Sequence, residues 1–465
     1  MVRASLLLLL AASATVAAKN SPSSYLPSPP STSFKAKVSS LEEVRGGGGQ
    51  SDFGPATAEV APSVFNLVNN VAGAGLLTLS AAMAKGTGWV PAMVICGVLG
   101  AISSHSFKLI GESCRLTGEM DFKGLWTKTI GGSTTYIVDA IIALMCSAAS
   151  IIYSGVVGDV STELLSSFGI ASSRSKNILL ITATILFPLS LLRNLSALAF
   201  TSVLGFASIV YTVLFITFRA WDGSYGIGPG EVGKFIADDV IVKPSFERSS
   251  LWGFDFTTLI MCSNLGLAFI AHYNAPVYYR EMRDKKDFKK MVTIAFSILT
   301  LLYASTMAFG MKTFGDVCQG NIILNYHPKD VLSTLGRVAT FFSILFGFPL
   351  TFCGIREGMQ GIAARFNWTS VLENRTALIV ALLSFVTYVS ITVTDISFIV
   401  GITGAAMGSM IVYILPATIY AKSVALAHGK NSPEYKSARW NYALVPFGLC
   451  LGLFGVGMTI AESRR

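Results

Sequence analysis

The sequence has little charge and lacks the common motifs of metal, nucleotide and hydrolytic chemistry. Only 13% of its 465 residues are Asp, Glu, Lys or Arg, about half the ~25% typical of soluble domains. Its seven cysteines form no CxxC pair and no metal-ligand spacing, and HExxH, GxSxG and P-loop motifs are absent. We therefore expect no structural zinc, no disulfide framework, no cofactor and no enzymatic activity.

Apolar sequence is abundant instead. The chain is 52% hydrophobic, with a mean hydropathy of +0.60. Its net charge of +9 comes from short basic segments between apolar runs, which is the pattern of cytoplasmic loops rather than of a nucleic-acid-binding patch. The composition predicts a multi-pass protein of the plasma membrane or an organelle membrane. Its surroundings would be a lipid bilayer, and we expect a monomer with no nucleic-acid partner.

Eleven apolar spans follow residue 60, and most reach the ~20 residues that a bilayer requires. They cover residues 63–84, 89–112, 131–157, 177–192, 197–219, 256–275, 291–311, 333–355, 375–393, 397–421 and 440–461. The loop 276–290 is basic and the loop 220–255 is acidic, so the positive-inside rule places them on opposite faces, with the basic loop inside. The predicted fold class is all-α integral membrane, with eleven transmembrane helices.

The first 60 residues differ from this pattern. Residues 1–19 have a basic start, a short apolar run and small residues at Ala17 and Ala18, as a secretory signal peptide does. The Ser- and Pro-rich sequence that follows, with four glycines at 46–49, predicts disorder. A two-part organelle targeting sequence and an uncleaved cytoplasmic tail remain alternatives. We divide the chain into this tail (1–60), a core of ten helices (61–421), and an eleventh helix with the C-terminus (422–465).

The first span contains three amides and a glycine pair that a simple membrane anchor does not need. Asn66, Asn69 and Asn70 precede Gly73-Ala74-Gly75 in an otherwise apolar stretch. Buried amides require partners, and glycines allow a helix to open and expose backbone N–H and C=O groups. Broken helices of this kind line the midplane binding sites of secondary transporters. The alternative is a seam of small residues for close helix packing.

The sixth span repeats these features. It carries Asn264, Gly266, His272, Asn274 and Pro276 within a short stretch. Because it lies five spans after the first, the spacing predicts two inverted five-helix repeats, spans 1–5 and 6–10, with one helix added.

Two ionisable residues within the spans are candidates for a functional role, because charges in a membrane are costly. They are Asp139, near the start of the third span, and His272. For each, the alternative is a structural hydrogen bond. The pairs Gly404/Gly408 and Gly448/Gly452 are spaced as in helix-packing motifs, and we interpret them in that way.

Five stretches carry a family resemblance. They read SVFNLVNNVAGAGLLTL in the first span, FPLSLLRNLSALAFTSVLG at the fourth and fifth, AFIAHYNAPVYYREM at the sixth, TFGDVCQGNIILNY after the seventh and GITGAAMGSMIVYILPATIY in the tenth. Together they resemble the amino acid/auxin permease family, and most closely its sodium-coupled neutral amino acid transporter branch. The resemblance implies the bacterial leucine transporter type of fold, a 5+5 inverted repeat plus one helix. It also implies transport of an amino acid with Na⁺ or H⁺ by alternating access.

The resemblance also implies a site at the two broken helices, where exposed N–H groups bind the substrate carboxylate and carbonyls bind its ammonium. A side-chain pocket would then select the amino acid, and the lack of an evident fixed charge beside the first span suits a neutral one. The substrate-binding residues carried over by position are Asn70, Val71, Ala72, Gly73, Ala74, Gly75, Phe269 and Ala271. The candidates for ion coupling are Asn69, Ser343, Asp139 and His272.

The eighth span departs from the sodium-coupled branch, in which a threonine shortly before a proline helps to ligate Na⁺. The matching positions before Pro349 are Leu345 and Gly347, and neither has a side-chain oxygen. Na⁺, like other hard cations, requires several oxygens, so we expect proton-driven or uncoupled transport rather than strict Na⁺ dependence. Ser343 lies close enough in sequence to supply the missing oxygen, which keeps Na⁺ as an alternative.

Two other classes of function remain as alternatives to a secondary transporter. A membrane amino acid sensor with little transport activity would use the same site to switch a partner. A membrane-embedded enzyme would have to be built on His272, but no carboxylate lies near that residue in its span.

Overall fold

The computed structural model describes residues 56–191, 201–228, 231–236 and 243–464. These residues belong to one compact unit that spans residues 55–465. Nearly all of the predicted tail, together with residue 192 of the fourth span and residues 197–200 of the fifth, lies outside the described residues.

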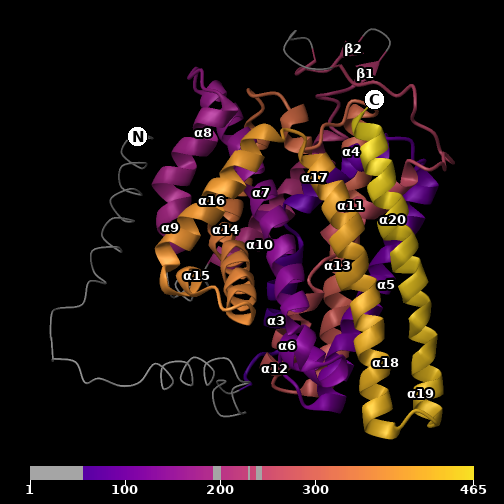
Figure 1. Cartoon of the computed structure of the whole chain (residues 1–465). Helices are drawn as coiled ribbons and strands as arrows, with labels where there is room; N and C mark the ends of the chain where they lie inside the picture. Colours follow the sequence, from indigo (N-terminus) through magenta and orange to yellow (C-terminus); the bar gives the residue numbers. More distant parts are fainter. Residues whose placement is uncertain (1–55, 192–200, 229–230, 237–242, 465) are drawn as a thin grey trace, which may run out of the picture. The chain divides into compact units, whose positions relative to one another are not determined.

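The regular secondary structure of the described chain is helical apart from one short hairpin and two isolated β-bridges (Figure 1). The first half contains α3 (Val60–Val71), η1 (Ala74–Thr78), α4 (Leu79–Ala84), α5 (Trp89–Thr117), α6 (Phe122–Thr129), η2 (Gly132–Thr134), α7 (Thr135–Ser167), α8 (Arg174–Ile181), η3 (Thr182–Leu186), α9 (Phe187–Leu191) and α10 (Thr201–Arg219). An antiparallel hairpin of β1 (Ile227–Gly228) and β2 (Glu231–Val232) follows.

The second half continues the pattern. It contains α11 (Thr258–Ala268), η5 (His272–Asn274), α12 (Ala275–Glu281), η6 (Lys285–Asp287), α13 (Phe288–Phe314), η7 (Ile322–Asn325), α14 (Val331–Arg365), α15 (Thr369–Glu373), α16 (Arg375–Thr392), α17 (Ile396–Thr403), η8 (Gly404–Ile414), α18 (Leu415–His428), α19 (Pro433–Ala438), η9 (Arg439–Ala443) and α20 (Leu444–Ser463). The segments η3 and η8 are π-helical, and the other η segments are 3-10 helices.

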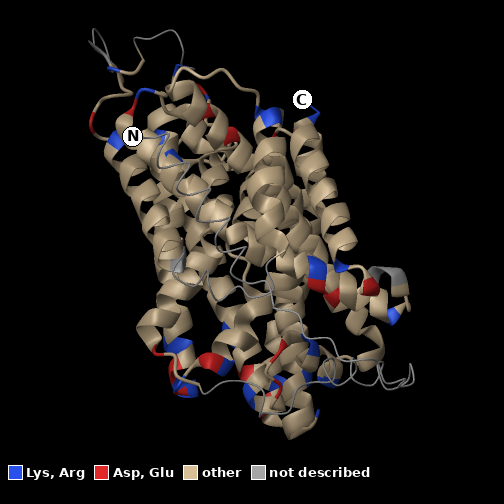
Figure 2. Cartoon of the chain, turned by 90° about the vertical axis from the view of Figure 1, so that its left-hand side faces the viewer, with Lys and Arg blue, Asp and Glu red and all other residues tan. Residues whose placement is uncertain are grey.

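Seven helical stretches among the described residues are long and apolar enough to cross a membrane. An eighth is added if the bent pair α3 and η1–α4 counts as one span. Charged residues gather at the upper and lower ends and in a further group at about mid-height, and uncharged residues cover most of the remaining length (Figure 2). The prediction of an all-α, multi-pass membrane protein is therefore confirmed. The count of eleven spans and the inverted repeat stay predictions.

Close helix crossings occur where the sequence has small residues. A Cβ atom on Gly404 of η8 would lie 1.8 Å from the carbonyl oxygen of Ser263 in α11, so no side chain fits there. A Cβ on Gly408 would lie 2.9 Å from the backbone of Gly266. These two glycines therefore allow η8 and α11 to pack backbone to backbone, which agrees with the packing interpretation of the motif.

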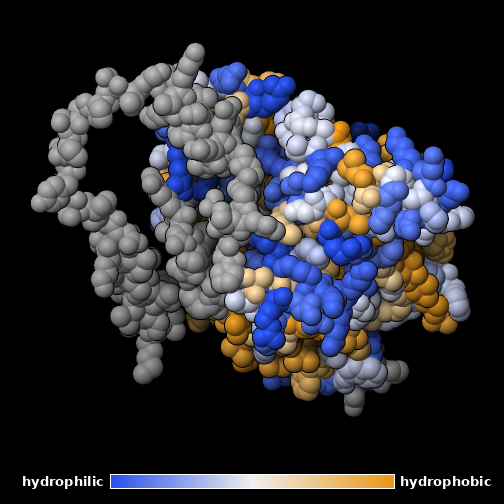
Figure 3. Space-filling view, turned by 90° about the horizontal axis from the view of Figure 1, so that it is seen from below, coloured by the Kyte–Doolittle hydropathy of each residue, from blue (hydrophilic) through white to orange (hydrophobic). Residues whose placement is uncertain are grey.

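The basic and acidic loops lie at opposite ends of the helices. The helix α12, which leads into the basic loop, lies at the lower end in Figure 1, whereas the hairpin β1–β2 of the acidic loop lies at the upper end. Hydrophilic residues cover much of the lower face, with hydrophobic residues toward its edge (Figure 3). This arrangement agrees with the orientation expected from the loop charges.

At the upper end, a buried ion pair joins α10 to the start of α14. Two guanidinium nitrogens of Arg219 lie 2.6 and 2.9 Å from the carboxylate oxygens of Asp330, whose side chain is fully buried. The Tyr225 hydroxyl donates a further hydrogen bond of 3.0 Å to the same carboxylate. Burial raises the pKa of Tyr225 and the charge of Asp330 raises it further, so the hydroxyl keeps the proton that it donates.

At the lower end, the residues before α3 pair with the end of α12. The Ala58 N–H donates to the Glu281 carbonyl at 3.0 Å, and the Arg283 N–H donates to the Ala58 carbonyl at 2.9 Å. An exposed ion pair of 3.1 Å between Arg283 and Glu59 accompanies them. We call this parallel pairing the inner strap.

Candidate functional site

The first span breaks at the glycine-containing segment. The helix α3 ends at Val71, η1 begins at Ala74, and the two parts meet at a bend of 52°. The Gly73 N–H turns back to the Val71 carbonyl at 2.8 Å. The first N–H groups of a helix have no partner within it, and Gly73, which precedes η1, has no side chain to cap them. The predicted break is thus present, and it leaves helix-start N–H groups without a side-chain cap.

A second break lies in the sixth span. The helix α11 ends at Ala268, and helical structure resumes only at His272. A buried tyrosine of α13 connects the two breaks, because the Tyr303 hydroxyl donates to the Ala268 carbonyl at 2.6 Å and lies 3.3 Å from the Val71 carbonyl. The two interrupted helices therefore meet at one point in the core.

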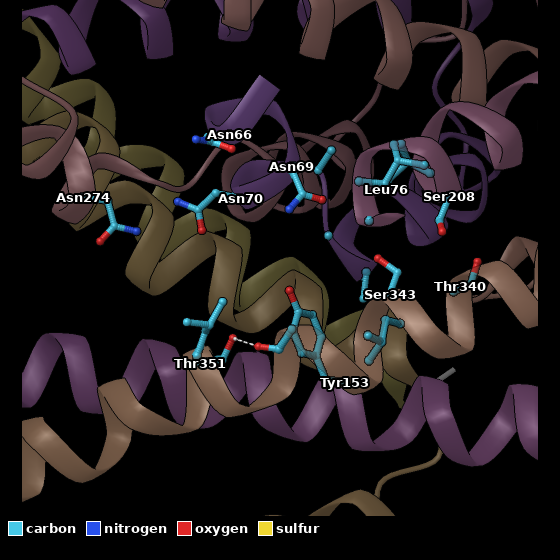
Figure 4. Close-up of a pocket in the computed structure, with 18 of the residues that line it drawn as sticks. Asn66, Asn69, Asn70, Leu76, Tyr153, Ser208, Asn274, Thr340, Ser343 and Thr351 are labelled. Atoms are coloured by element: carbon cyan, nitrogen blue, oxygen red, sulfur yellow. Dashed lines mark hydrogen bonds between the residues drawn. The ribbon is translucent and has the colours of Figure 1, made fainter. Parts of the chain in front are cut away.

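A cavity of about 480 Å³ opens beside the first break. It is lined by residues of α3, η1, α7, α10, α12 and α14, together with Asn274 at the end of η5 (Figure 4). The polar residues of its lining are Asn66, Asn69, Asn70, Tyr153, Ser208, Thr212, Asn274, Tyr278, Glu281, Thr340, Ser343 and Thr351. Most are amides and hydroxyls, and Glu281 is the sole carboxylate among the lining residues. Such a cavity suits a small ligand that forms many hydrogen bonds.

Half of the sequence-predicted site residues line this cavity. They are Asn69, Asn70, Ala72, Gly73, Ala74 and Ser343. The other half are not part of the lining, namely Val71, Gly75, Phe269, Ala271, Asp139 and His272.

Three of the residues outside the lining pack behind the breaks. A Cβ on Gly75 would lie 3.4 Å from the Cα of Ala268, so Gly75 faces α11. Phe269 is fully buried with its ring 4.9 Å from that of Tyr303, and Ala271 is buried as well. These residues support the backbone of the breaks rather than the cavity surface.

His272 is enclosed by uncharged groups. Its Nε2 atom lies 3.0 Å from the Ser103 carbonyl and 2.9 Å from the Ser106 hydroxyl, and the rings of Phe107 and Phe296 pack against it. The carbonyl can only accept, so Nε2 carries the hydrogen. A second proton would place a charge among partners that carry none, which is costly in a buried position.

Asp139 lies near the start of α7, away from the cavity. Its carboxylate is 2.5 Å from the Lys123 ammonium and the residue is buried. This ion pair attaches α6 to α7, which is the structural alternative considered for Asp139 from the sequence.

Asn69 and Ser343 face one another across a glycine of α10. A Cβ on Gly205 would lie 2.4 Å from Asn69 Oδ1 and 3.3 Å from Ser343 Oγ. The two oxygens therefore border the same gap, and a side chain at position 205 would fill it. The sequence supplied both residues as candidates but gave no indication of Gly205.

Tyr153 was missed by the sequence analysis. It lies on α7, and its hydroxyl is 2.8 Å from the position that a Cβ on Gly73 would take. In Figure 4 this hydroxyl points toward the side of the cavity that carries Asn69 and Asn70. The one available signal was a tyrosine in the middle of a predicted membrane span.

Comparison with known proteins identifies the family. The sequence pattern of the family described as transmembrane amino acid transporter protein matches residues 56–462. The chain belongs to this family. The amino acid/auxin permease resemblance is thereby confirmed, and this transporter family member is not an enzyme.

Individual relatives agree with this membership. The transporter is 23% identical over 400 residues to sodium-coupled neutral amino acid symporter 2 of Danio rerio, covering 81% of this chain and 77% of the relative. It is 26% identical to vacuolar amino acid transporter 5 of Schizosaccharomyces pombe, over 77% of this chain and 83% of the relative. It is also 26% identical to vacuolar amino acid transporter 6 of Saccharomyces cerevisiae, over 69% and 70%.

Proposed function

We propose that this protein is a secondary active transporter of neutral amino acids that works by alternating access and is driven by an H⁺ or Na⁺ gradient. The observation that carries the proposal is the polar cavity beside the break of α3, where η1 begins without a side-chain cap. Its amides and hydroxyls suit an amino acid, and family membership supports the same substrate class. The name of the Danio rerio relative, a sodium-coupled neutral amino acid symporter, supports a neutral substrate and a symport mechanism.

In this proposal the chain crosses the membrane eleven times. Seven crossings are the long apolar stretches, and the bent pair α3–α4 is an eighth. The other three are shorter helical segments, namely α8–α9, α10 and α11–α12. Two inverted five-helix repeats would then begin at the two breaks, in the bacterial leucine transporter type of fold. The meeting of both breaks at Tyr303 supports this pairing.

The proposed binding mode uses backbone groups for the shared part of the substrate. The N–H groups at the start of η1 would bind the carboxylate, and carbonyls of the breaks would bind the ammonium. Asn70 and residues 72–74 line the cavity at this point. Four other predicted residues do not line the cavity and would help indirectly, by fixing the conformation of the breaks. They are Val71, Gly75, Phe269 and Ala271.

For ion coupling, the gap between Asn69 and Ser343 is the strongest candidate. Two oxygens border it, and the hydroxyls of Thr340 and Ser208 belong to the same lining. The lack of side-chain oxygens at Leu345 and Gly347 argued against Na⁺ coupling. The oxygens around this gap argue for it. Asp139, which pairs with Lys123, and His272, which has uncharged partners, are weaker candidates for a coupled proton.

The direct test is uptake of radiolabelled neutral amino acids by proteoliposomes under imposed Na⁺ and H⁺ gradients in turn. We expect concentrative uptake with at least one gradient. Binding of amino acids without uptake under either gradient would contradict transport and would indicate the sensor alternative.

Ser343→Ala tests the coupling site. If Na⁺ occupies the gap, loss of one of its oxygens raises the half-saturating Na⁺ concentration about tenfold or more. Ser423→Ala is the matched control, because Ser423 is buried in α18 and bonds only to its own helix. Unchanged Na⁺ dependence in Ser343→Ala would exclude the gap as the Na⁺ site.

A further inference from the structure

A loop at the upper end exposes several large apolar side chains. Residues 246–256 form the last part of the acidic loop and lead into α11, and within them Trp252 is 69% exposed and Phe256 is 77% exposed. Phe246, Leu251 and Phe254 are exposed as well. This segment contains no helix or strand. A group of exposed apolar side chains of this size indicates a surface that contacts a membrane or another apolar partner.

Backbone hydrogen bonds hold this loop in place. The first N–H groups of α5 donate to it, from Trp89 to Ser250 at 3.1 Å and from Val90 to Leu251 at 3.1 Å. The Gly88 N–H donates to the Gly253 carbonyl at 2.7 Å. The loop thus caps the N-terminal end of α5, and these hydrogen bonds fix the position of the backbone that carries the exposed aromatic residues.

A cleft of about 560 Å³ with charges of both signs lies beside this loop. Its lining includes the cations Lys85 and Arg248 and the carboxylates Asp255 and Glu462. Lys85 and Glu462 are 3.3 Å apart. The Thr257 hydroxyl lies within hydrogen-bond distance of the Lys85 carbonyl and the Asp255 carboxylate and can donate its hydrogen to either, so it links these two residues at the cleft.

The cleft lies at the level of helix ends. Lys85 follows the last residue of α4, Glu462 is in the last turn of α20, and Thr257 precedes α11. In Figure 1 the upper ends of α4 and α20 lie close together. Helix ends of this kind meet the headgroup region of a bilayer, where tryptophan and other aromatic residues are enriched.

We propose that this cleft binds the headgroup of a zwitterionic phospholipid of the outer leaflet, with the aromatic loop inserted between neighbouring lipids. Lys85 and Arg248 contact the phosphate, and Asp255 and Glu462 contact the amine. Equal numbers of cations and carboxylates match a headgroup with one charge of each sign better than an anionic headgroup. A free amino acid carries the same two charges, but it offers no acyl chains to the exposed Trp252 and Phe254.

Native mass spectrometry of the full-length protein in detergent tests this proposal, with dioleoylphosphatidylethanolamine as the probe. Dioleoylphosphatidylglycerol keeps the phosphate and lacks the amine. We expect saturable binding of the ethanolamine lipid, about tenfold tighter than binding of the glycerol lipid. Addition of free glycine or alanine should not displace it. Equal binding of the two lipids, or displacement by the free amino acids, would overturn the proposal.

Substitutions identify the contacts. Arg248→Gln should weaken binding of the ethanolamine lipid about tenfold, whereas Arg248→Lys should retain most of it. Asp255→Asn should remove the preference for the ethanolamine lipid. Lys430→Gln, at the turn between α18 and α19, is the control and should bind as the wild type does.

Trp252→Ser combined with Phe254→Ser separates a lipid from a protein partner. This variant should weaken binding of both lipids and keep the headgroup preference. If it binds lipid as the wild type does but loses a co-purifying protein, the surface belongs to a protein partner and the proposal is wrong. A thermal unfolding scan of each variant shows whether it is folded.

Discussion

Gly73 lies at the point where the first span opens and the Tyr153 hydroxyl approaches the backbone. Space at this position is limited, since a Cβ atom would lie 2.8 Å from that hydroxyl. Gly75 is different, because a Cβ there would make an ordinary contact of 3.4 Å with Ala268. The two glycines of the motif therefore have separate roles, one at the cavity and one at the packing surface.

Gly73→Val should abolish uptake while the protein still reaches the membrane. The β-branched side chain stiffens the break and displaces Tyr153. Gly97→Val is the matched control, because a Cβ on Gly97 would meet no atom within 4 Å. Surface biotinylation or membrane fractionation measures the amount of protein, and radiolabelled uptake measures activity. Wild-type uptake by Gly73→Val would count against a site at this break.

Tyr153→Phe should raise the KM for the amino acid about tenfold, which is the effect of losing one hydrogen bond to the substrate. Tyr388→Phe on the exposed side of α16 is the control, since that ring is 68% exposed. Initial uptake rates over a range of substrate concentrations give the KM and the maximal rate of each variant. An unchanged KM would show that the Tyr153 hydroxyl makes no contact with the substrate.

At the scale of single elements, the sequence predicted where helices occur and where they break. The break of α3 follows from its amides and glycines, because those residues have no place in a plain apolar span. The orientation of each helix about its own axis was harder to predict. The polar residues of α7 do not gather on one face, so periodicity did not indicate that Tyr153 faces the cavity. Phe269 and His272 were expected at the site from their place in the sixth span, yet neither is among the residues that line the cavity.

The element α14 depends on Asp330, which both caps it and pairs with Arg219. Asp330 accepts a hydrogen bond from the Leu332 N–H at 3.0 Å, so Asp330→Asn keeps a capping side chain and removes the buried charge. Arg219 then keeps its ion pair with Asp222 but loses the one with Asp330, so the free energy of unfolding should fall by about 2 kcal/mol. A thermal unfolding scan in detergent should show a clear fall in the unfolding temperature.

Asp395→Asn is the matched control for this prediction. Asp395 also caps a helix, by accepting from the N–H groups of Ser397 and Phe398, but it is exposed. Its replacement should change stability by less than about 1 kcal/mol. Equal effects of the two substitutions would show that the ion pair adds little to the stability of α14.

At the scale of the whole molecule, the charges of the loops predict its orientation in the membrane. An epitope tag after Lys286 should be reached only from the cytoplasmic, matrix or stromal side, and a tag after Glu247 only from the opposite side. A third tag after Asn431 should behave as the first does, because α12 and α19 lie at the same end in Figure 1. Antibody binding with and without permeabilisation makes the measurement. Detection of the first two tags on one side would refute the orientation.

The inner strap links two parts of the chain that are more than 200 residues apart in sequence. Two backbone hydrogen bonds join Ala58 to residues 281 and 283, and each contributes about 1 kcal/mol. Most side-chain substitutions leave such bonds intact, because they involve only the main chain. In the proposed alternating access, the lower half of the first broken span would therefore carry the lower half of the sixth with it. The two halves would then move as one unit, and a force applied to the chain before residue 58 would act on both at once.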